Sequence, residues 1–486
     1  MRRRGVLLSA VVAALLLGCT VRPPPIDLGA WQAPRGREHP LVGRIWDTKA
    51  RRFVTSEDVV AGLTSARYVL LGERHDHPDH HRVQAALVRA LLAAGRRPAV
   101  VFEMFTADDR AAIARHLAAA PRDAAGLAAA VDWARSGWPD WAYYEPIAQA
   151  ALDAGLPIVA GNLAPSTARA LFQLINTIVP YVLLWVLMWF VKDISLWFAL
   201  PLAMLAGTLL VRVFIFFHDC GHGSFFKSHW ANAVFGFLCG VLTFTPYYHW
   251  RWQHAIHHGT SSHLDKRGVG DIWTMTVHEY LESTRWKRFS YRFQRNPFVL
   301  FVIAPLYIFL FRQRFAASDA SPRERYSVWL MNLALLVVAV LMSWAFGFWT
   351  YLLLQGVAWM VAGASGIWLF YIQHQFEDAY WERDEQWDYT AAALQGSSYY
   401  KLPRVLQWLS GNIGFHHIHH LASNIPNYNL ERCHYADPVF QQVKPITLFG
   451  SLKSLNFRLW DEASKKLVSF RRIRHLRRES RRKRDE

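Results

Sequence analysis

The sequence predicts a multi-domain chain, in which a partial α/β segment precedes an all-α domain that crosses a membrane several times. Long apolar runs lie almost wholly after residue 172, and their lengths suit membrane spans. Before that point the chain is rich in Ala and Arg, and short apolar runs alternate with stretches of helical periodicity. A length of 486 residues leaves room for two or three domains.

Charge and cysteine content narrow the class of protein. The formal net charge is +17, and the chain ends in a basic tail at 471–486. Beside membrane spans, such charge fits positive-inside topology and anionic lipid better than nucleic acid, so no nucleic-acid partner is expected. Four cysteines do not make a disulfide framework.

Residues 1–19 have the pattern of a secretory signal. Three arginines precede an apolar stretch from Val6 to Leu17, which is too short for a comfortable membrane span. The end of this stretch resembles a bacterial lipobox, which implies cleavage before Cys19 and lipidation of its thiol. An uncleaved N-terminal anchor is the alternative.

Residues 20–168 read as an α/β domain. We expect short buried strands at 68–72, 98–103 and 156–160, with helices at 83–95 and 124–136 between them. Strands that alternate with helices favour a parallel sheet with its polar residues at the strand ends.

Three stretches of this segment, LLGERHDHPDHHRVQ, VFEMF and WPDWAYYEPI, carry a family resemblance. They resemble the ChaN-like haem-binding lipoproteins of the Tiki-related superfamily, so that residues 1–168 would be a truncated member with its signal. The resemblance implies that Glu73, His75 and Glu103 line a site for haem. The alternative is a solvated polar loop around these histidines. Because the segment stops after about three strands, we expect an apolar sheet edge and an incomplete core.

Six apolar runs follow residue 172. Four have the length of membrane spans, and the two shorter ones, at 230–246 and 298–311, would lie in the interface or re-enter. The expected spans are 174–191, 195–217, 328–346 and 348–372.

The charges between these runs predict the topology. The connection between the first two spans holds Lys192 and Asp193 only, whereas Lys and Arg crowd the connection between spans two and three. The positive-inside rule puts that connection and the basic tail in the cytoplasm. With four spans, every histidine cluster described next falls on the same side.

Histidines cluster beside the apolar runs. His218 and His222 are four residues apart, and the pairs His254/His257 and His416/His419 are three apart, so each pair shares a helix face. His258 and His420 are adjacent to the second and third pairs, and His374 ends the last span. We expect His229, His249, His263, His278 and His434 to be interfacial or surface residues, and His417 lies off the ligand spacing.

Nine imidazoles suit two metal ions with four or five ligands each. Imidazole binds zinc, copper, iron and nickel, and the absence of a matching cysteine set in the sequence argues against a structural zinc site. Redox-active iron fits best. Asp219, Asp271 and Glu377 are candidates to hold imidazole N–H groups in place.

Six motifs carry a second family resemblance: FIFFHDCGHGSFF, FTPYYHWRWQHAIHH, GVGDIWT, FYIQHQFE, GNIGFHHIHHL and IPNYNLERC. They resemble the membrane-bound acyl-lipid fatty acid desaturases of bacteria and plastids, over about residues 172–470. The resemblance implies four transmembrane helices, interfacial helices and a His-rich cytoplasmic cap. The implied di-iron ligands are His218, His222, His254, His257, His258, His374, His416, His419 and His420.

The same resemblance implies a reaction. An acyl-lipid chain would gain a cis double bond, with two Fe ions as cofactor and O2 as co-substrate. Electrons would come from a ferredoxin or cytochrome b5 type partner. An acyl tunnel is expected beside Trp250, Trp252 and Trp273. A histidine-box hydroxylase or ketolase is the nearest alternative, and a haem-binding lipoprotein is the alternative from another class.

The two halves predict different sides of the bacterial inner membrane. A cleaved lipoprotein signal would export residues 20–168, whereas multi-pass topology with cytoplasmic histidines requires a cytoplasmic start for the first span. A fusion joined near residues 166–172 is the simplest hypothesis, in which the signal goes unused or the first run fails to span.

Overall fold

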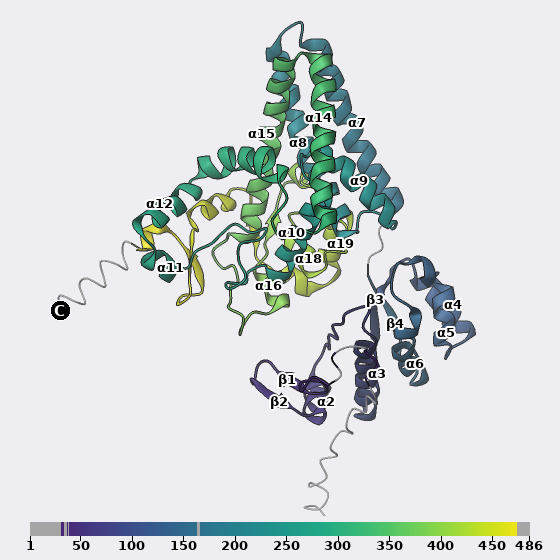
Figure 1. Cartoon of the computed structure of the whole chain (residues 1–486). Coiled ribbons are helices and arrows are strands. Elements are labelled where there is room, and N and C mark those ends of the chain that lie inside the picture. The colour runs from purple at the N-terminus through teal and green to yellow at the C-terminus, as the bar shows by residue number, and fades with distance from the viewer. Residues whose placement is uncertain (1–30, 34–35, 37, 163–165, 474–486) are drawn as a thin grey trace, which may run out of the picture. The chain divides into compact units, whose positions relative to one another are not determined.

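The chain forms two compact units, Met1–Ala164 and Pro165–Glu486, in a computed structural model that describes residues 31–33, 36, 38–162 and 166–473. The expected signal at 1–19, with Cys19, lies outside the described residues, as does most of the basic tail. Each unit is described by itself below (Figure 1).

The N-terminal unit is a small α/β structure, as the sequence predicts. Strands β3 (Val100–Thr106) and β4 (Ile158–Asn162) pair in parallel, with Val100 beside Ile158. The antiparallel hairpin of β1 (Ile45–Asp47) and β2 (Arg52–Val54) precedes them. The helices are α2 (Ser56–Ser65), α3 (Pro78–Ala93), α4 (Arg110–Ala119), α5 (Ala124–Ala130) and α6 (Glu145–Asp153), with short 3-10 turns at Trp133–Arg135 and Trp141–Tyr143.

The strand expected at 68–72 is wrong. This segment pairs with no strand among the described residues, and Tyr68 and Leu70 are 71% and 84% exposed. The side-chain amide of Gln84 donates to the Leu71 carbonyl at 2.9 Å. This hydrogen bond replaces one that the backbone of a neighbouring strand would donate. An apolar run therefore lies exposed here, in line with the incomplete core expected for this segment.

Two expected helices differ at their ends. Helix α3 begins five residues before the expected start, because Pro78 is well tolerated in a first helical turn. Helix α5 ends at Ala130, because Asp132 adopts a left-handed conformation with φ of 54°. Trp133 and Trp141 then pack with Tyr144 in the buried core of the unit.

The second unit is mostly helical and has four helices that are long and apolar enough to cross a membrane, as expected. They extend several residues beyond the apolar runs, since polar residues continue the same helices at the His-bearing end. The four spans are α7 (Thr167–Val191), α8 (Leu196–His222), α14 (Pro322–Phe346) and α15 (Phe348–His374).

The spans form two helical hairpins that stand together in Figure 1. Gly347 turns α14 into α15 with φ of +80°, a conformation that glycine adopts without strain. Only 11% of the apolar window of α14 is buried, and Trp344 is 87% exposed. Lipid is the solvent that suits such an apolar exterior, so this unit is a membrane protein.

The two shorter apolar runs form no simple span. Helix α9 (His229–Leu242) covers the first. In the second, helix α12 (Arg285–Gln294) meets Val299–Arg314 at a bend of 64°. That continuation is π-helical at Val299–Ile303 and Tyr307–Phe311, around α13 (Ala304–Leu306), and packs on α15 through Pro305 and Gly363.

Shorter elements gather at one end of the spans (Figure 1). They include two short pairs of strands, parallel β5–β6 and antiparallel β7–β8. The helices are α10 (Tyr247–Thr260), α11 (Val277–Glu282), α16 (Tyr389–Gln395), α17 (Arg404–Leu409), α18 (His416–Leu421) and α19 (Asn427–Ala436). The strands are β5 (Tyr399–Lys401), β6 (Pro445–Thr447), β7 (Leu459–Asp461) and β8 (Lys466–Val468).

Candidate metal centre

Four helices bring the clustered histidines together. Helices α8 and α15 end at His222 and His374, and α10 and α18 carry the other two clusters. Within each helix, the spacing of three or four residues keeps paired imidazoles on one face. The ends of two membrane spans therefore meet two short helices at the same level.

The nine predicted imidazoles form two groups that could each hold a metal ion. In each group the candidate ligand atoms all lie within 4.8 Å of one another. The five-imidazole group consists of His218, His222, His254, His258 and His419, and the four-imidazole group of His257, His374, His416 and His420.

The nitrogens within these groups approach one another closely. The Nε2 atoms are 3.1 Å apart in the pairs His254/His258 and His374/His416, and 3.0 Å apart between His258 and His419. Two nitrogens bound at right angles to one ion, each about 2.1 Å from it, would be about 3 Å apart. The spacing therefore suits shared metal ligands.

Several of these nitrogens are buried without a hydrogen-bond partner among the described residues. A buried polar atom without a partner costs about 1–3 kcal/mol, and metal coordination through Nε2 would remove that cost for His222, His257 and His420. The unpartnered atoms are Nε2 of His222, His257 and His420, and Nδ1 of His258, His416 and His419. The donor set therefore fits metal ions that accept imidazole.

Burial also sets the charge state of the imidazoles outside the spans. It lowers the pKa of His254, His258 and His416 well below the ordinary value, and neighbouring imidazoles lower it further. The same causes lower the pKa of His419 and His420. These rings are neutral at pH 7, the state in which an imidazole nitrogen can bind a metal ion.

Two of the three expected carboxylates contact an imidazole. Asp271 Oδ1 lies 2.6 Å from His257 Nδ1, and Asp219 Oδ1 lies 3.1 Å from His218 Nδ1. Gly270, with φ of +71°, lets the chain approach His257 closely, since a Cβ there would lie 2.9 Å from the His257 Cβ. Glu377, in contrast, is exposed, and its carboxylate contacts no imidazole among the described residues.

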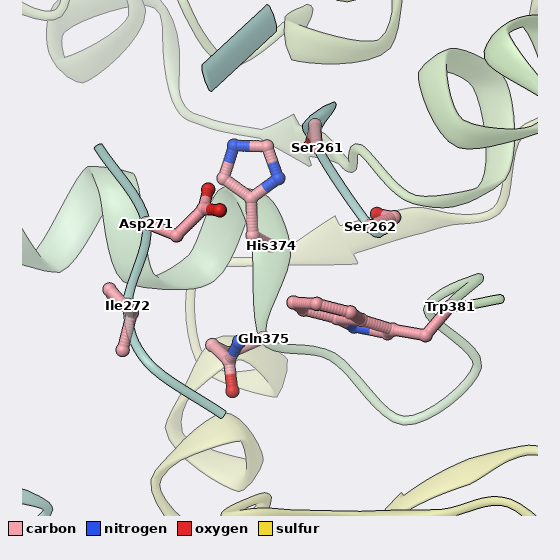
Figure 2. A pocket seen from close by; sticks show the side chains of 7 residues that line it. All are labelled: Ser261, Ser262, Asp271, Ile272, His374, Gln375 and Trp381. Atoms are coloured by element: carbon pink, nitrogen blue, oxygen red, sulfur yellow. The ribbon is translucent and has the colours of Figure 1, made fainter. Parts of the chain in front are cut away.

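A small pocket opens beside the four-imidazole group (Figure 2). It has room for about one water molecule, roughly 10 Å³, so it is too small for an acyl chain. Its lining residues are Ser261, Ser262, Asp271, Ile272, His374, Gln375 and Trp381.

The expected tunnel tryptophans lie apart from this pocket. Trp250 stacks on His254, with ring centres 4.3 Å apart, and contacts His218. Trp252 contacts His249, and Trp273 is 43% exposed, with Arg267 over its ring. Of these three residues, Trp250 touches the five-imidazole group.

Three histidines expected at the surface are buried. His434 Nδ1 lies 3.1 Å from His417 Nε2, and burial lowers the pKa of His417 to about 3. His263 lies 2.9 Å from Asp384, and His249 accepts from the Ala317 amide. Their partners are distant in the sequence, so no local pattern predicts their burial. His229 and His278 are exposed, as expected.

The predicted site of the N-terminal unit is only partly assembled. Glu73 lies 2.8 Å from His75 Nδ1 and 2.9 Å from His81 Nδ1, and accepts from the Tyr144 hydroxyl. His81, outside the predicted set, is buried and packs against Tyr144. Glu103 is exposed on β3. Burial and the Glu73 carboxylate raise the pKa of Tyr144.

The fold and the two imidazole groups define a multi-pass membrane protein with a buried polyhistidine centre. Residues 195–446 match the family described as "Fatty acid desaturase", and residues 59–174 match "Haem-binding uptake, Tiki superfamily, ChaN". The chain belongs to the fatty acid desaturase family, whose members are oxidoreductases, and carries a ChaN-type segment before that domain.

Curated relatives agree with this assignment. The chain is 49% identical to "Fatty acid desaturase" of Bacillus subtilis (strain 168) over 318 residues, which are 65% of this chain and 90% of that protein. It is 27% identical to "sn-1 oleoyl-lipid 12-desaturase" of Synechocystis sp., over 49% of this chain and 68% of the relative. It is 28% identical to "sn-1 acyl-lipid omega-3 desaturase (ferredoxin)" of the same organism, over 51% and 68%.

Proposed function

We propose that this protein is a di-iron, O2-dependent desaturase that introduces a cis double bond into an acyl-lipid chain. The observation that carries the proposal is the convergence of nine imidazoles, seven of them buried and two half-buried, into two groups at the ends of membrane spans. Two relatives, at 27% and 28% identity, have names that specify acyl-lipid or oleoyl-lipid substrates.

Iron is the metal that we assign to both groups. Bound iron would supply the one-electron chemistry that lets O2 oxidise an unactivated methylene. The chain's own residues orient the imidazoles: with Asp271 accepting from Nδ1–H of His257, and Asp219 from His218, each ring would have Nε2 available to hold the ion. Burial of the rings keeps bulk water out of the centre.

The overall reaction requires an external reductant. A saturated pair of methylenes, one O2, two electrons and two protons give one double bond and two waters. A one-electron carrier of the ferredoxin or cytochrome b5 type would supply the electrons, and one relative's name includes ferredoxin. Lys and Arg at 251–325 would attract an acidic carrier.

We place the imidazole groups on the cytoplasmic side of the bacterial inner membrane. The basic connections support this orientation through the positive-inside rule. Because four spans return the chain to its starting side, the start of α7 shares that side with His222 and His374.

The test is the fatty-acid profile of a desaturase-lacking bacterium that expresses the full chain or His257→Ala. We expect new cis-unsaturated chains with the wild type and none with the variant. Hydroxylated or keto products would replace the proposal with the hydroxylase or ketolase alternative. An unchanged profile from stable, iron-loaded wild-type protein, with a reduced carrier supplied, would overturn it.

A second function, haem binding, rests on the ChaN match of residues 59–174. The cluster of Glu73, His75 and His81 is the place that we propose for it, within a domain at 20–168 that precedes the desaturase domain at 172–470. Haem added to the purified full chain should give an absorbance band that His75→Ala weakens and His257→Ala leaves unchanged. A band insensitive to His75 would contradict this site.

A further inference from the structure

The first two turns of α7 contact the start of α19. The backbone amide of Ser166 donates to the Tyr428 hydroxyl at 2.8 Å, and the Arg169 guanidinium donates to Asn429 Oδ1 at 2.8 Å. Farther along α7, Gln173 Nε2 donates to Asn427 Oδ1 at 2.9 Å. Three consecutive residues at the start of α19, Asn427, Tyr428 and Asn429, thus accept hydrogen bonds from α7 and from Ser166, which caps it.

Asn427, the residue that accepts from Gln173, also contacts Asp219, which in turn contacts His218 of the five-imidazole group. Asp219 Oδ2 accepts from the backbone amide of Asn427 at 2.6 Å and from its Nδ2 at 2.9 Å. The other oxygen of Asp219 faces His218 Nδ1 at 3.1 Å. Gln173, Asn427, Asp219 and His218 are all buried.

The contacts of Asn427 give these hydrogen bonds a direction. Asn427 donates both its backbone N–H and its Nδ2–H to Asp219, which leaves its Oδ1 to accept from Gln173. Gln173 must then present its amide nitrogen. At the other end, an Nδ1–H of His218 that donates to the Asp219 carboxylate would leave Nε2 free for a metal ion.

Gln173 is otherwise costly to bury. Its Oε1 has no hydrogen-bond partner among the described residues, and its side chain is 7% exposed. An unsatisfied amide oxygen costs about 1–3 kcal/mol. An apolar side chain would avoid that cost, so stability of the span alone does not account for a glutamine here.

We propose that Gln173 and Asn427 are positioning residues for the five-imidazole group, so that the first membrane span sets the metal affinity of one of the two ion sites. The inference rests on the proposed function, since it assumes that both groups bind metal. The four-imidazole group is oriented separately, by Asp271 on His257. The two ion sites should therefore respond to different substitutions.

The test is a titration of metal-stripped, purified full chain with Co2+, read from its visible absorption. We expect two ions bound by the wild type. In Gln173→Met, which keeps the side-chain length and removes the donor, one ion should bind about 10- to 100-fold more weakly, as when a group that orients a ligand is lost. Asn427→Asp, which turns an acceptor toward Asp219, should weaken the same ion at least as much.

Two further variants identify the affected ion. In a His420→Ala background, which removes a ligand of the four-imidazole group, Gln173→Met should still weaken the remaining Co2+. Arg169→Met is the matched control, because it removes the neighbouring hydrogen bond between α7 and α19 without touching Asp219; it should leave both ions unchanged.

The outcomes separate this inference from the proposed function. Equal Co2+ affinities in Gln173→Met and the wild type, or an equal loss at both sites, would overturn the positioning role and leave the proposed function standing. A wild type that binds no Co2+ would overturn both. An altered Co2+ spectrum at one site in Gln173→Met, with the thermal unfolding midpoint unchanged, would establish positioning over general destabilisation.

Discussion

The two units both contain a histidine-rich region, yet only one gathers its histidines into buried groups. In the N-terminal unit, His75, His77, His80 and His81 come from one short segment, and the rings of His77 and His80 stack on each other. No three of them join a candidate metal group among the described residues. In the membrane unit, four separate helices each contribute imidazoles.

Convergence of several helices, together with burial of most of the rings, explains the difference, since His81 of the N-terminal unit is buried as well. The His75 side chain is 44% exposed, so water can satisfy its nitrogens. In the membrane unit most of the imidazoles are buried where two spans meet α10 and α18, and several nitrogens lack any partner among the described residues. Histidine density alone therefore does not make a candidate metal centre, whereas convergence of distant helices with unpartnered nitrogens does.

Loss of a ligand should have the largest effect. We expect His416→Ala to lower desaturation at least about 100-fold, because even the groups that orient metal ligands are each worth about 10- to 100-fold. The fatty-acid profile and iron content of the purified protein measure it. His80→Ala, in the N-terminal unit, should change neither; an equal loss in both variants would erase the distinction between the two regions.

Substitution of a supporting carboxylate should have the next largest effect. Asp271→Asn removes the acceptor charge beside His257 and should weaken one metal ion about 10- to 100-fold. Glu377→Gln, at an exposed carboxylate three residues after His374, is the matched control and should leave metal affinity unchanged. Co2+ titration measures the metal affinity of both variants. A weaker Co2+ affinity in Glu377→Gln would show that an exposed carboxylate can also orient a metal ligand.

Sequence reasoning placed the nine imidazoles because their spacing and flanking apolar runs are local properties. The same holds for the four spans, whose length and hydropathy are independent of packing. Asp271 could also be predicted from the sequence, since it lies in the contiguous motif GVGDIWT. Local pattern and fold agree in these elements.

Residues whose partners are distant could not be found this way. Gln173 and Asn427 are separated by 254 residues, and His417 and His434 pair within a fold that no spacing reveals. The segment 68–72 has the composition of a strand, yet it pairs with no strand among the described residues. Whether this segment forms a strand depends on its tertiary contacts, which override the strand propensity of its residues.

Neutralising basic residues of α12 should have a smaller effect. Trp286, Phe289 and Phe293 are exposed on one side of this helix, while Tyr291 is buried on the other. We expect the helix to lie at the lipid surface, where each nearby Lys or Arg contributes about 1 kcal/mol of attraction to anionic lipid.

The measurement is the rise in the unfolding midpoint when phosphatidylglycerol is added to the full chain in neutral lipid. Replacing Arg285 and Lys287, both exposed, by Gln should reduce that rise. The matched change Arg115→Gln with Arg122→Gln, at exposed positions of the N-terminal unit, should not. An equal reduction in both would mean that lipid acts on the whole chain through net charge.

Removal of the N-terminal unit should have the smallest effect on desaturation. Residues 1–164 contribute no member to either imidazole group, and Ser166, Arg169 and Gln173 all follow the boundary. Substitutions at distant sites without shared partners add to within about 0.5 kcal/mol, or about a factor of two, and we expect the same tolerance for this deletion. A chain that starts with Met before Pro165 should therefore retain both Co2+ sites and the wild-type fatty-acid profile to within about twofold.

Loss of Co2+ binding in this shortened chain would show that the metal centre needs the first unit after all. Intact Co2+ sites with much higher activity would instead locate the effect in membrane insertion, because the deletion also removes the predicted export signal at 1–19.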